Sequence, residues 1–349
     1  MASPNVIVSR DASDRLREWS DEFRSALVLA PFISWVEKYG RLRVTNALRT
    51  TFPIPIDAAG YKELVGDITF RKLYARSLTM TSKQWFDAIQ AKARIVESDE
   101  FMDWSGAPAR MAFEWQRYPQ VRAAIMLALN SFAGPQLDFY RDPDSQTVTA
   151  RNLFAADHPF NVLDSTVGSF DNTMSFTRSQ IKDGTMVQSI NDRFRLIKGP
   201  NGQDLGLTMQ GGSFLTPSVF DNDFKELLEQ DTLIRAVQNV GKTENVAGVI
   251  QKNIWGKSYG VNYDVGVELS RPAAGGANGD YLYALAAPKA GLVPWVAQQG
   301  SAPEEILHDK TSELYKRSQQ IGVSYVGEFN IAGCLPHPII RVKITDSNP

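Results

Sequence analysis

Asp157 and His158 stand side by side in the segment NLFAADHPFNV, in a chain of 349 residues with three histidines. An aspartate that orients a histidine could support general base catalysis, because the carboxylate fixes the imidazole tautomer and stabilises its protonated form. Adjacency argues against such a pair, since consecutive side chains of an extended segment point to opposite faces. Pro159 favours extended geometry at His158. We therefore expect a turn whose flanking rings, Phe154 and Phe160, lie in the core.

The other two histidines and the single cysteine give no metal site. His308 lies in the charged stretch EEILHDKTSELYKR, and His337 lies between two prolines. Neither forms an H-x-x-x-H or H-E-x-x-H pattern, in which two imidazoles share one helix face toward Zn²⁺. A lone Cys334 forms no internal disulfide and no metal cluster, and its apolar neighbours favour a core position. The sequence predicts no metal and no cofactor.

Two glycine-containing segments have part of a phosphate-binding pattern. In VGKT (240–243), the last three residues match the end of the G-x-x-x-x-G-K-[ST] pattern, but Ala236 stands where the pattern requires its first glycine. The residues before it are predicted to end a helix, with Gly241 as its left-handed cap. AAGGANGD lacks the G-x-G-x-x-G spacing and opens no helix, so it is predicted to be a hairpin loop. Neither segment indicates a nucleotide site.

No further catalytic constellation is found. The chain has no G-x-S-x-G pattern, and the carboxylates Glu97, Asp99 and Glu100 form a cluster of the kind that usually faces solvent or caps a helix. We predict that the protein is not an enzyme. A cytosolic enzyme with a converged Asp157–His158 site is an alternative, and loss of turnover in a His158→Ala variant would identify it.

Composition narrows the class of protein. A hydrophobic content of 43% and a charged content of 22% are those of an ordinary globular protein, and the length suffices for a large core. A formal net charge of -2 argues against a dedicated nucleic-acid binder, whose affinity would come mainly from Lys and Arg. We expect no secretory signal, because the start lacks a basic region followed by an apolar core. No run of 18 apolar residues exists, so no membrane-spanning helix is expected.

An N-terminal helix and a long hairpin stand apart from the other predicted elements. Residues 13–29 place Trp19 and Phe23 on the apolar face of an amphipathic helix, which a loose arm precedes. Residues 41–93 indicate extended strands or a long hairpin with weakly apolar faces, which is marginally stable alone. We expect that neither element buries its apolar residues within the chain and that each needs a partner surface.

The hairpin is rich in basic side chains. Their aromatic neighbours are not spaced as a stacking platform for nucleic acid, so pairing with acidic residues of a neighbouring chain is favoured. The basic residues are Lys62, Arg71, Lys72, Arg76, Lys83, Lys92 and Arg94. Our candidates for contacts between subunits are Trp19, Phe23, Arg71, Lys72, Arg76 and Lys83.

The remaining pattern mixes helices and strands. Residues 104–130 favour a helix, and Pro119 within it predicts two pieces that meet at a kink near Tyr118. Helices are also predicted around 186–194 and from an N-cap at Thr216 onward.

The last third is predicted to be rich in strands, in SYGVNYDVGVEL, YLYALAA and LVPWVAQQ. Alternation near the end predicts that residues 321–325 and 340–344 form a half-buried antiparallel pair.

The order of these motifs resembles that of the major capsid proteins of tailed bacteriophages, in particular the Mu-like major head subunit group. Trp19, Phe23 and Leu27 before Ala30–Pro31 resemble the opening W-x3-F-x3-L pattern of that group. GDITFRKLYARSLTMTSKQWFDAIQAKARIVESDEF is similar to its long hairpin, and NLFAADHPFNV resembles its N-x-F-x-x-x-H-P signature. PNGQDLGL followed by FLTPSVFDNDFKELL resembles its nG-x-x-L-g-l, strand and helix element.

The resemblance implies an α+β fold of the Hong Kong 97 phage type. The implied parts are an N-terminal arm and helix (1–44), an extended hairpin loop (45–95), a peripheral domain with a spine helix (96–162), an apical domain (163–304) and the return strands of the peripheral domain (305–349). Arm and hairpin would lie across adjacent subunits.

The implied function is structural. Copies of the chain would assemble as pentamers and hexamers into an icosahedral shell that encloses double-stranded DNA without sequence-specific binding. A cement or decoration protein, a portal and a scaffold are implied as further partners, with no membrane. The protein would be made in the cytoplasm of a host bacterium and reside in the virion. An encapsulin-like compartment shell, which encloses cargo protein, is the second alternative.

Overall fold

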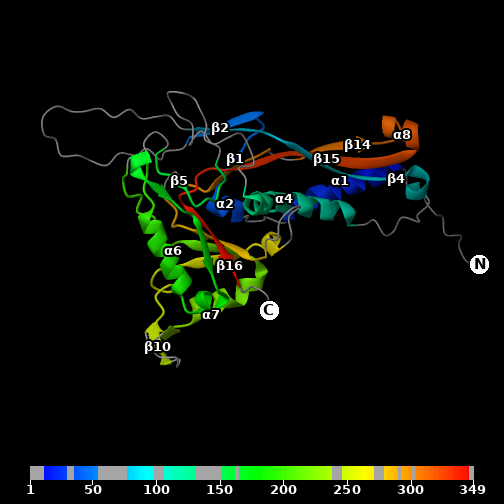
Figure 1. The fold of residues 1–349 in the computed structure, drawn as a ribbon. Helices are drawn as coiled ribbons and strands as arrows, with labels where there is room; N and C mark the ends of the chain where they lie inside the picture. Colours follow the sequence, from blue (N-terminus) through cyan, green and yellow to red (C-terminus); the bar gives the residue numbers. More distant parts are fainter. Residues whose placement is uncertain are drawn as a thin grey trace, which may run out of the picture.

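The molecule is elongated and has two parts, a long sheet flanked by helices and a second sheet with its own helices (Figure 1). The computed structural model describes residues 12–29, 35–53, 77–97, 106–130, 151–161, 165–200, 202–237, 246–270, 279–289, 292–300 and 303–345. Helices and strands alternate irregularly and both sheets are mixed, so the predicted α+β class is confirmed.

The long sheet is organised around one 14-residue strand, β15. Residues 322–326 of β15 pair with both β14 and β4, so this strand lies between the other two. Its C-terminal half pairs with β13, which also pairs with β1 in parallel. The strands of this sheet are β1 (Arg41–Val44), β4 (Gln84–Lys92), β13 (Trp295–Gln299), β14 (Glu304–His308) and β15 (Gln320–Gly333).

Two helices, α1 (Ala12–Leu29) and α4 (Ala107–Leu129), pack together on one face of this sheet (Figure 1). Contrary to the prediction of two pieces that meet near Tyr118, α4 is one helix that continues through Pro119. Proline removes one backbone donor, but Pro119 is buried, and the packing of α4 on β15 outweighs that local loss.

Short elements complete this part of the molecule. A separate two-stranded antiparallel ladder joins β2 to β3, with Pro53 opposite Ser77. The elements are β2 (Arg49–Pro53), β3 (Ser77–Thr81), α2 (Trp35–Tyr39), α3 (Ala93–Glu97) and α8 (Glu313–Ser318).

The second part is a compact unit with its own core. Its sheet has the order β11-β8-β12-β16-β7, and the core contains Phe194, Phe214, Phe224 and Ile340, each with 0% exposure. Its strands are β7 (Thr173–Phe176), β8 (Ser213–Thr216), β11 (Asn262–Val265), β12 (Tyr281–Leu285) and β16 (Ile339–Ile344). Its helices are α5 (Arg178–Lys182), α6 (Thr185–Leu196) and α7 (Asp221–Glu229), and β9 (Thr232–Val237) pairs with β10 (Val246–Lys252).

Two predictions about the strands and helices are wrong. Residues 321–325 and 340–344 do not pair, because β15 belongs to the long sheet and β16 to the compact unit. Thr216 ends β8 and caps no helix, since Pro217 is extended and a 3₁₀ turn at Ser218–Phe220 precedes α7. The strands of the last third and the helix around 186–194 are confirmed.

Candidate assembly surface

His158 and Asp157 do not form a catalytic pair. The imidazole has 0% exposure and lies 3.2 Å from the carbonyl oxygen of Leu153, whereas the Asp157 carboxylate faces solvent and accepts a 2.5 Å hydrogen bond from Arg151. Burial lowers the pKa of His158 to about 4, so the ring is neutral at pH 7. Phe154 and Phe160 are buried as the sequence predicts, with 2% and 7% exposure, but the predicted turn is wrong: β5 (His158–Pro159) is extended and pairs with β6 (Ser169–Phe170).

Asn172 holds this segment in place. Its side-chain amide donates to the carbonyl oxygens of Leu153 (2.9 Å) and Pro336 (3.1 Å), and its oxygen accepts from the Ala155 amide (3.0 Å). The asparagine has 0% exposure, so these bonds satisfy a fully buried polar group. This segment, the loop at Pro336 and the start of β7 are thereby joined.

Two histidines meet at one aromatic ring. The rings of His158 and His337 lie 5.2 and 4.7 Å from that of Phe170, between centroids. His308 lies elsewhere, on β14, where its Nε2 is 2.6 Å from the Ser324 hydroxyl. Among the described residues, no group of three His, Cys, Asp or Glu side chains could hold a metal ion.

The other sequence candidates occupy ordinary positions. Cys334 is 2% exposed and its burial raises the thiol pKa to about 12. Ala236 lies in strand β9, so the predicted helix end before VGKT is wrong; the strand forms because it pairs with β10. VGKT itself, most of AAGGANGD, Asp99 and Glu100 lie outside the described residues, and Glu97 ends α3.

Trp19 and Phe23 are buried within the chain. They are 6% and 3% exposed, and the Phe23 ring stacks on that of Tyr325 with centroids 3.6 Å apart. The expectation that this helix finds no surface in its own chain is therefore wrong, because α4 and β15 provide one. A role of both residues between subunits stays a prediction. Lys83 is exposed, and Arg71, Lys72 and Arg76 lie outside the described residues.

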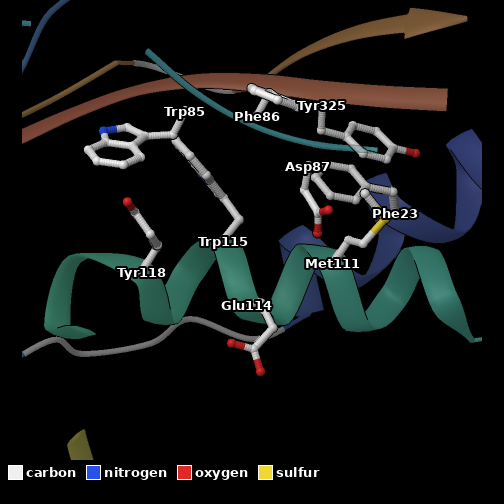
Figure 2. A pocket seen from close by; sticks show the side chains of 9 residues that line it. All are labelled: Phe23, Trp85, Phe86, Asp87, Met111, Glu114, Trp115, Tyr118 and Tyr325. Carbon is white, nitrogen blue, oxygen red and sulfur yellow. The ribbon is translucent and has the colours of Figure 1, made fainter. Parts of the chain in front are cut away.

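A groove opens between α4 and β4. It has a volume of about 220 Å³, and aromatic rings dominate its wall (Figure 2). Trp85 reaches over Tyr118, with ring centroids 5.0 Å apart, and Asp87 points from β4 into the space between Trp115 and Phe23. The lining residues are Phe23, Trp85, Phe86, Asp87, Met111, Glu114, Trp115, Tyr118 and Tyr325, of which Phe86 borders the groove while its ring turns to the other face of the sheet.

Close contacts fix the shape of the groove. The Trp85 indole donates a 2.8 Å hydrogen bond to the carbonyl oxygen of Phe329, and the Arg122 guanidinium lies 4.6 Å from the Trp85 ring. Trp115 packs directly on the backbone of Gly327 in β15. These contacts hold the rings of the groove in one arrangement.

The opposite face of the sheet is open to solvent. Val326 of β15 pairs with Phe86 of β4 and with Glu304 of β14, which places Phe86 and Ile306 on the face that turns away from α1 and α4. Phe86 is 80% exposed and Ile306 is 41% exposed.

Sequence reasoning missed both surfaces. The pair Trp85–Phe86 carries a usable signal, because adjacent residues of a strand face opposite sides of a sheet. Both rings are therefore buried only if something covers each face of the sheet. The groove has no local signal, because Phe23 and Tyr325 lie at opposite ends of the sequence.

Polar contacts connect the two parts of the molecule. Arg117 of α4 binds Glu268 of the 3₁₀ turn η5 (Val267–Ser270), with 2.6 Å between Nε and Oε1. Lys38 binds Asp264 of β11 at 2.6 Å, and the Tyr39 hydroxyl donates to the same carboxylate. Two neighbouring carboxylates of the compact unit are thus bound by the helices of the long part.

Comparisons with known proteins give matches among solved structures. No protein-family model and no curated protein matches the sequence. A chain of the procapsid of bacteriophage JBD30 aligns at 13% identity with a TM-score of 0.45, over 95% of this chain and 74% of that chain. A chain of the mature capsid of bacteriophage PhiM1 aligns at 9% identity with a TM-score of 0.48, over 92% and 89%. A chain of Mycobacterium phage Patience aligns at 9% identity with a TM-score of 0.47, over 97% and 90%.

None of the helices in the described part of the chain is long and apolar enough to cross a membrane.

Proposed function

We propose that this chain is the major capsid subunit of a tailed phage, a prophage or a gene-transfer particle. Its activity is assembly with copies of itself into an icosahedral shell that encloses double-stranded DNA. The proposal includes the finer assignment to the Mu-like major head subunit group and the division of the chain into arm, hairpin loop, peripheral domain and apical domain.

The observation that carries this proposal is the uncovered face of the long sheet. Helices α1 and α4 cover one face of β4, β15 and β14, and the other face presents Phe86, Val326 and Ile306 to solvent. The rest of this face is polar, as the outer face of an antiparallel sheet can be, but the adjacent apolar side chains Phe86, Val326 and Ile306 mark a contact with another surface. The elongated shape supports the same conclusion, because a subunit that reaches past its own core can touch several neighbours (Figure 1).

The order of the sequence motifs provides the specific assignment. A helix with Trp19 and Phe23, a long hairpin, a long helix and the NLFAADHPFNV junction follow one another as in the capsid family. The further partners that we propose on this basis are a portal, a scaffold and a decoration protein. Synthesis in the host cytoplasm belongs to the same proposal.

Electron microscopy of the purified protein tests the assignment. Closed shells of uniform size are expected, and a monomer that does not assemble at high concentration would contradict it. Shells purified from infected or induced cells should contain DNA. Shells that contain only a cargo protein would instead identify an encapsulin-like compartment.

A further inference from the structure

We propose that a cavity in the compact unit binds a small sugar phosphate. The cavity has a volume of about 240 Å³ and lies between α6, the start of β9 and the end of β10 with the loop that follows it. This inference goes beyond the proposed function and does not depend on assembly, because the residues that line the cavity belong to one copy of the chain.

Helix α6 provides one wall of the cavity. Its lining side chains recur at spacings of three and four residues, which places them on one face of the helix. They are Gln188, Asn191, Asp192 and Arg195. This wall therefore presents polar and charged groups to whatever occupies the cavity.

A buried hydrogen-bond donor faces the cavity. The Asn191 side-chain oxygen accepts a 3.0 Å hydrogen bond from the Met209 amide, so the side-chain nitrogen, a donor, points the other way. Asn191 is 4% exposed, and within the described part of the chain this nitrogen has no hydrogen-bond partner and is not fully enclosed. A bound oxyanion would provide the acceptor that such a buried donor requires.

Two cations stand at the exposed edge of the same cavity. Arg195 and Lys252 both line it, and neither forms an ion pair with any described residue. Hydrogen bonds from charged donors to phosphate oxygens are about twice as strong as neutral ones. With the Asn191 nitrogen, these side chains provide donors from two elements for one phosphate group.

The loop on the other side of the cavity is held in one conformation. Asn253 donates to two carbonyl oxygens at the end of α7 and accepts from the Trp255 amide (3.0 Å). The Trp255 and Tyr259 rings pack with centroids 5.1 Å apart. Gly184 gives the indole its space, since a Cβ atom there would lie 3.0 Å from Trp255 Nε1. A site arranged before binding loses little conformational freedom when its ligand arrives.

The size of the cavity and its carboxylate favour a sugar phosphate over inorganic phosphate. A volume of about 240 Å³ is that of several water molecules at about 30 Å³ each, more than one phosphate ion fills. Asp192 would repel a free phosphate, but its carboxylate can accept hydrogen bonds from sugar hydroxyls. Leu233 and Ile254 add apolar surface for the carbon skeleton.

Calorimetric titration of the full chain at low ionic strength tests the site. Ribose 5-phosphate is the probe, and it should bind more tightly than inorganic phosphate, whereas ribose should give no binding at the same concentrations. Absence of ribose 5-phosphate binding, or equal binding of ribose, would overturn the proposal. Inorganic phosphate that binds as tightly as ribose 5-phosphate would overturn the choice of a sugar phosphate.

Charge removal shows whether the cavity is the place of binding. Arg195→Gln and Lys252→Gln should each weaken ribose 5-phosphate binding about tenfold, the loss expected for one charged hydrogen bond. Arg193→Gln is the matched control, because Arg193 lies on the same helix and does not line the cavity. It should leave the affinity nearly unchanged. Equal losses in all three variants would indicate only an effect of net charge and would overturn the proposal.

Two further variants test the polar groups of α6. Asn191→Asp keeps an oxygen for the Met209 amide but replaces the donor, so ribose 5-phosphate binding should be lost. Thermal unfolding without ligand shows whether this variant is folded, and a folded variant that binds normally would overturn the proposal. If it is unfolded, the exposed Arg195→Gln change decides.

Asp192→Asn should strengthen inorganic phosphate binding and reduce the preference for ribose 5-phosphate, because it removes the repulsion of a free phosphate. An unchanged preference would contradict the assignment of the sugar to this side of the cavity.

Discussion

Arg117 and Glu268 form a nearly buried ion pair across the junction between the long part of the molecule and the compact unit. Their Nε and Oε1 atoms are 2.6 Å apart, and the side chains are 12% and 6% exposed. Two charges removed from water are stabilised only by each other and by their hydrogen bonds, so either one becomes costly when its partner is lost. The pair adds a polar contact to the buried apolar cluster in which Ala123, Ala124 and Leu127 of α4 pack with β8 and β12 of the compact unit.

Replacing one partner should destabilise the subunit more than replacing both. Glu268→Gln leaves the buried Arg117 charge with only the exposed Glu114 carboxylate, 3.9 Å away, and should lower the free energy of unfolding by about 3 kcal/mol. The double variant Arg117→Met with Glu268→Met removes both charges and should lose clearly less. Urea denaturation of the unassembled subunit measures both values.

Asp231→Asn is the control for that pair, because Asp231 and Lys257 are also 2.6 Å apart but each is 76% exposed. Solvent screens this contact, so its loss should leave the unfolding midpoint unchanged. Equal losses in Glu268→Gln and Asp231→Asn would show that burial does not determine the strength of the Arg117 contact.

Gly327 provides the space that Trp115 occupies. A Cβ atom at position 327 would lie 2.1 Å from the Trp115 ring, so alanine would force α4 and β15 apart or turn the indole. We expect Gly327→Ala to lower the free energy of unfolding by about 1–3 kcal/mol, as overpacking does elsewhere, and to change the tryptophan fluorescence.

The matched control for Gly327 is Gly279→Ala, where a Cβ atom would meet nothing within 4 Å. This variant should keep the stability and the fluorescence of the original chain. Retained stability in Gly327→Ala would mean that Trp115 is not packed on β15 as described.

Local chemistry made the buried rings of NLFAADHPFNV predictable. Pro159 favours the extended backbone found at His158, and the two phenylalanines mark core positions. The structure places Phe154, His158 and Phe160 in the core accordingly. The helices around 13–29 and 186–194 were predictable for the same reason, since periodic apolar spacing is a local property. The pairing of His158–Pro159 with Ser169–Phe170 involves distant residues and was not predicted.

Partner choice between distant segments was not predictable. The alternation in 321–325 and in 340–344 has the same period of two, so it identifies two strands but does not say that they belong to different sheets. Pro119 likewise predicts a break in an isolated helix, whereas β15 holds α4 together. The groove needs four elements brought together by the fold, so no single stretch of sequence indicates it.

Burial of His158 should make the stability depend on pH. Its pKa is about 4 in the folded chain and about 6.5 when exposed, so below pH 6.5 the unfolded state binds more protons than the folded state. Stability should therefore fall as the pH decreases from about 6.5 to 4, by at most about 3 kcal/mol, and this contribution should stay constant below that range. Urea denaturation at pH 7 and pH 5 measures the difference.

His158→Gln removes the titrating group and should reduce this pH dependence. Asp157→Asn should retain it, because burial and not the neighbouring carboxylate is the main cause of the lowered pKa. If His158→Gln and the original chain lose the same stability between pH 7 and pH 5, the imidazole is not the group responsible.

Cys334 should be unreactive in the folded subunit. The side chain is 2% exposed in a cluster with Phe52, Val296 and Leu335, and its burial raises the thiol pKa to about 12. Only the thiolate attacks thiol reagents, so at pH 8 the reaction of Cys334 should be about a thousandfold slower than that of an ordinary cysteine.

Lys83→Cys, at an exposed position of the Cys334→Ala chain, gives the reference rate. In 8 M urea both thiols should react alike, because unfolding removes the burial that raises the pKa. Equal rates without urea would place Cys334 at an accessible surface and would contradict the packing of β3 against β13 and β15.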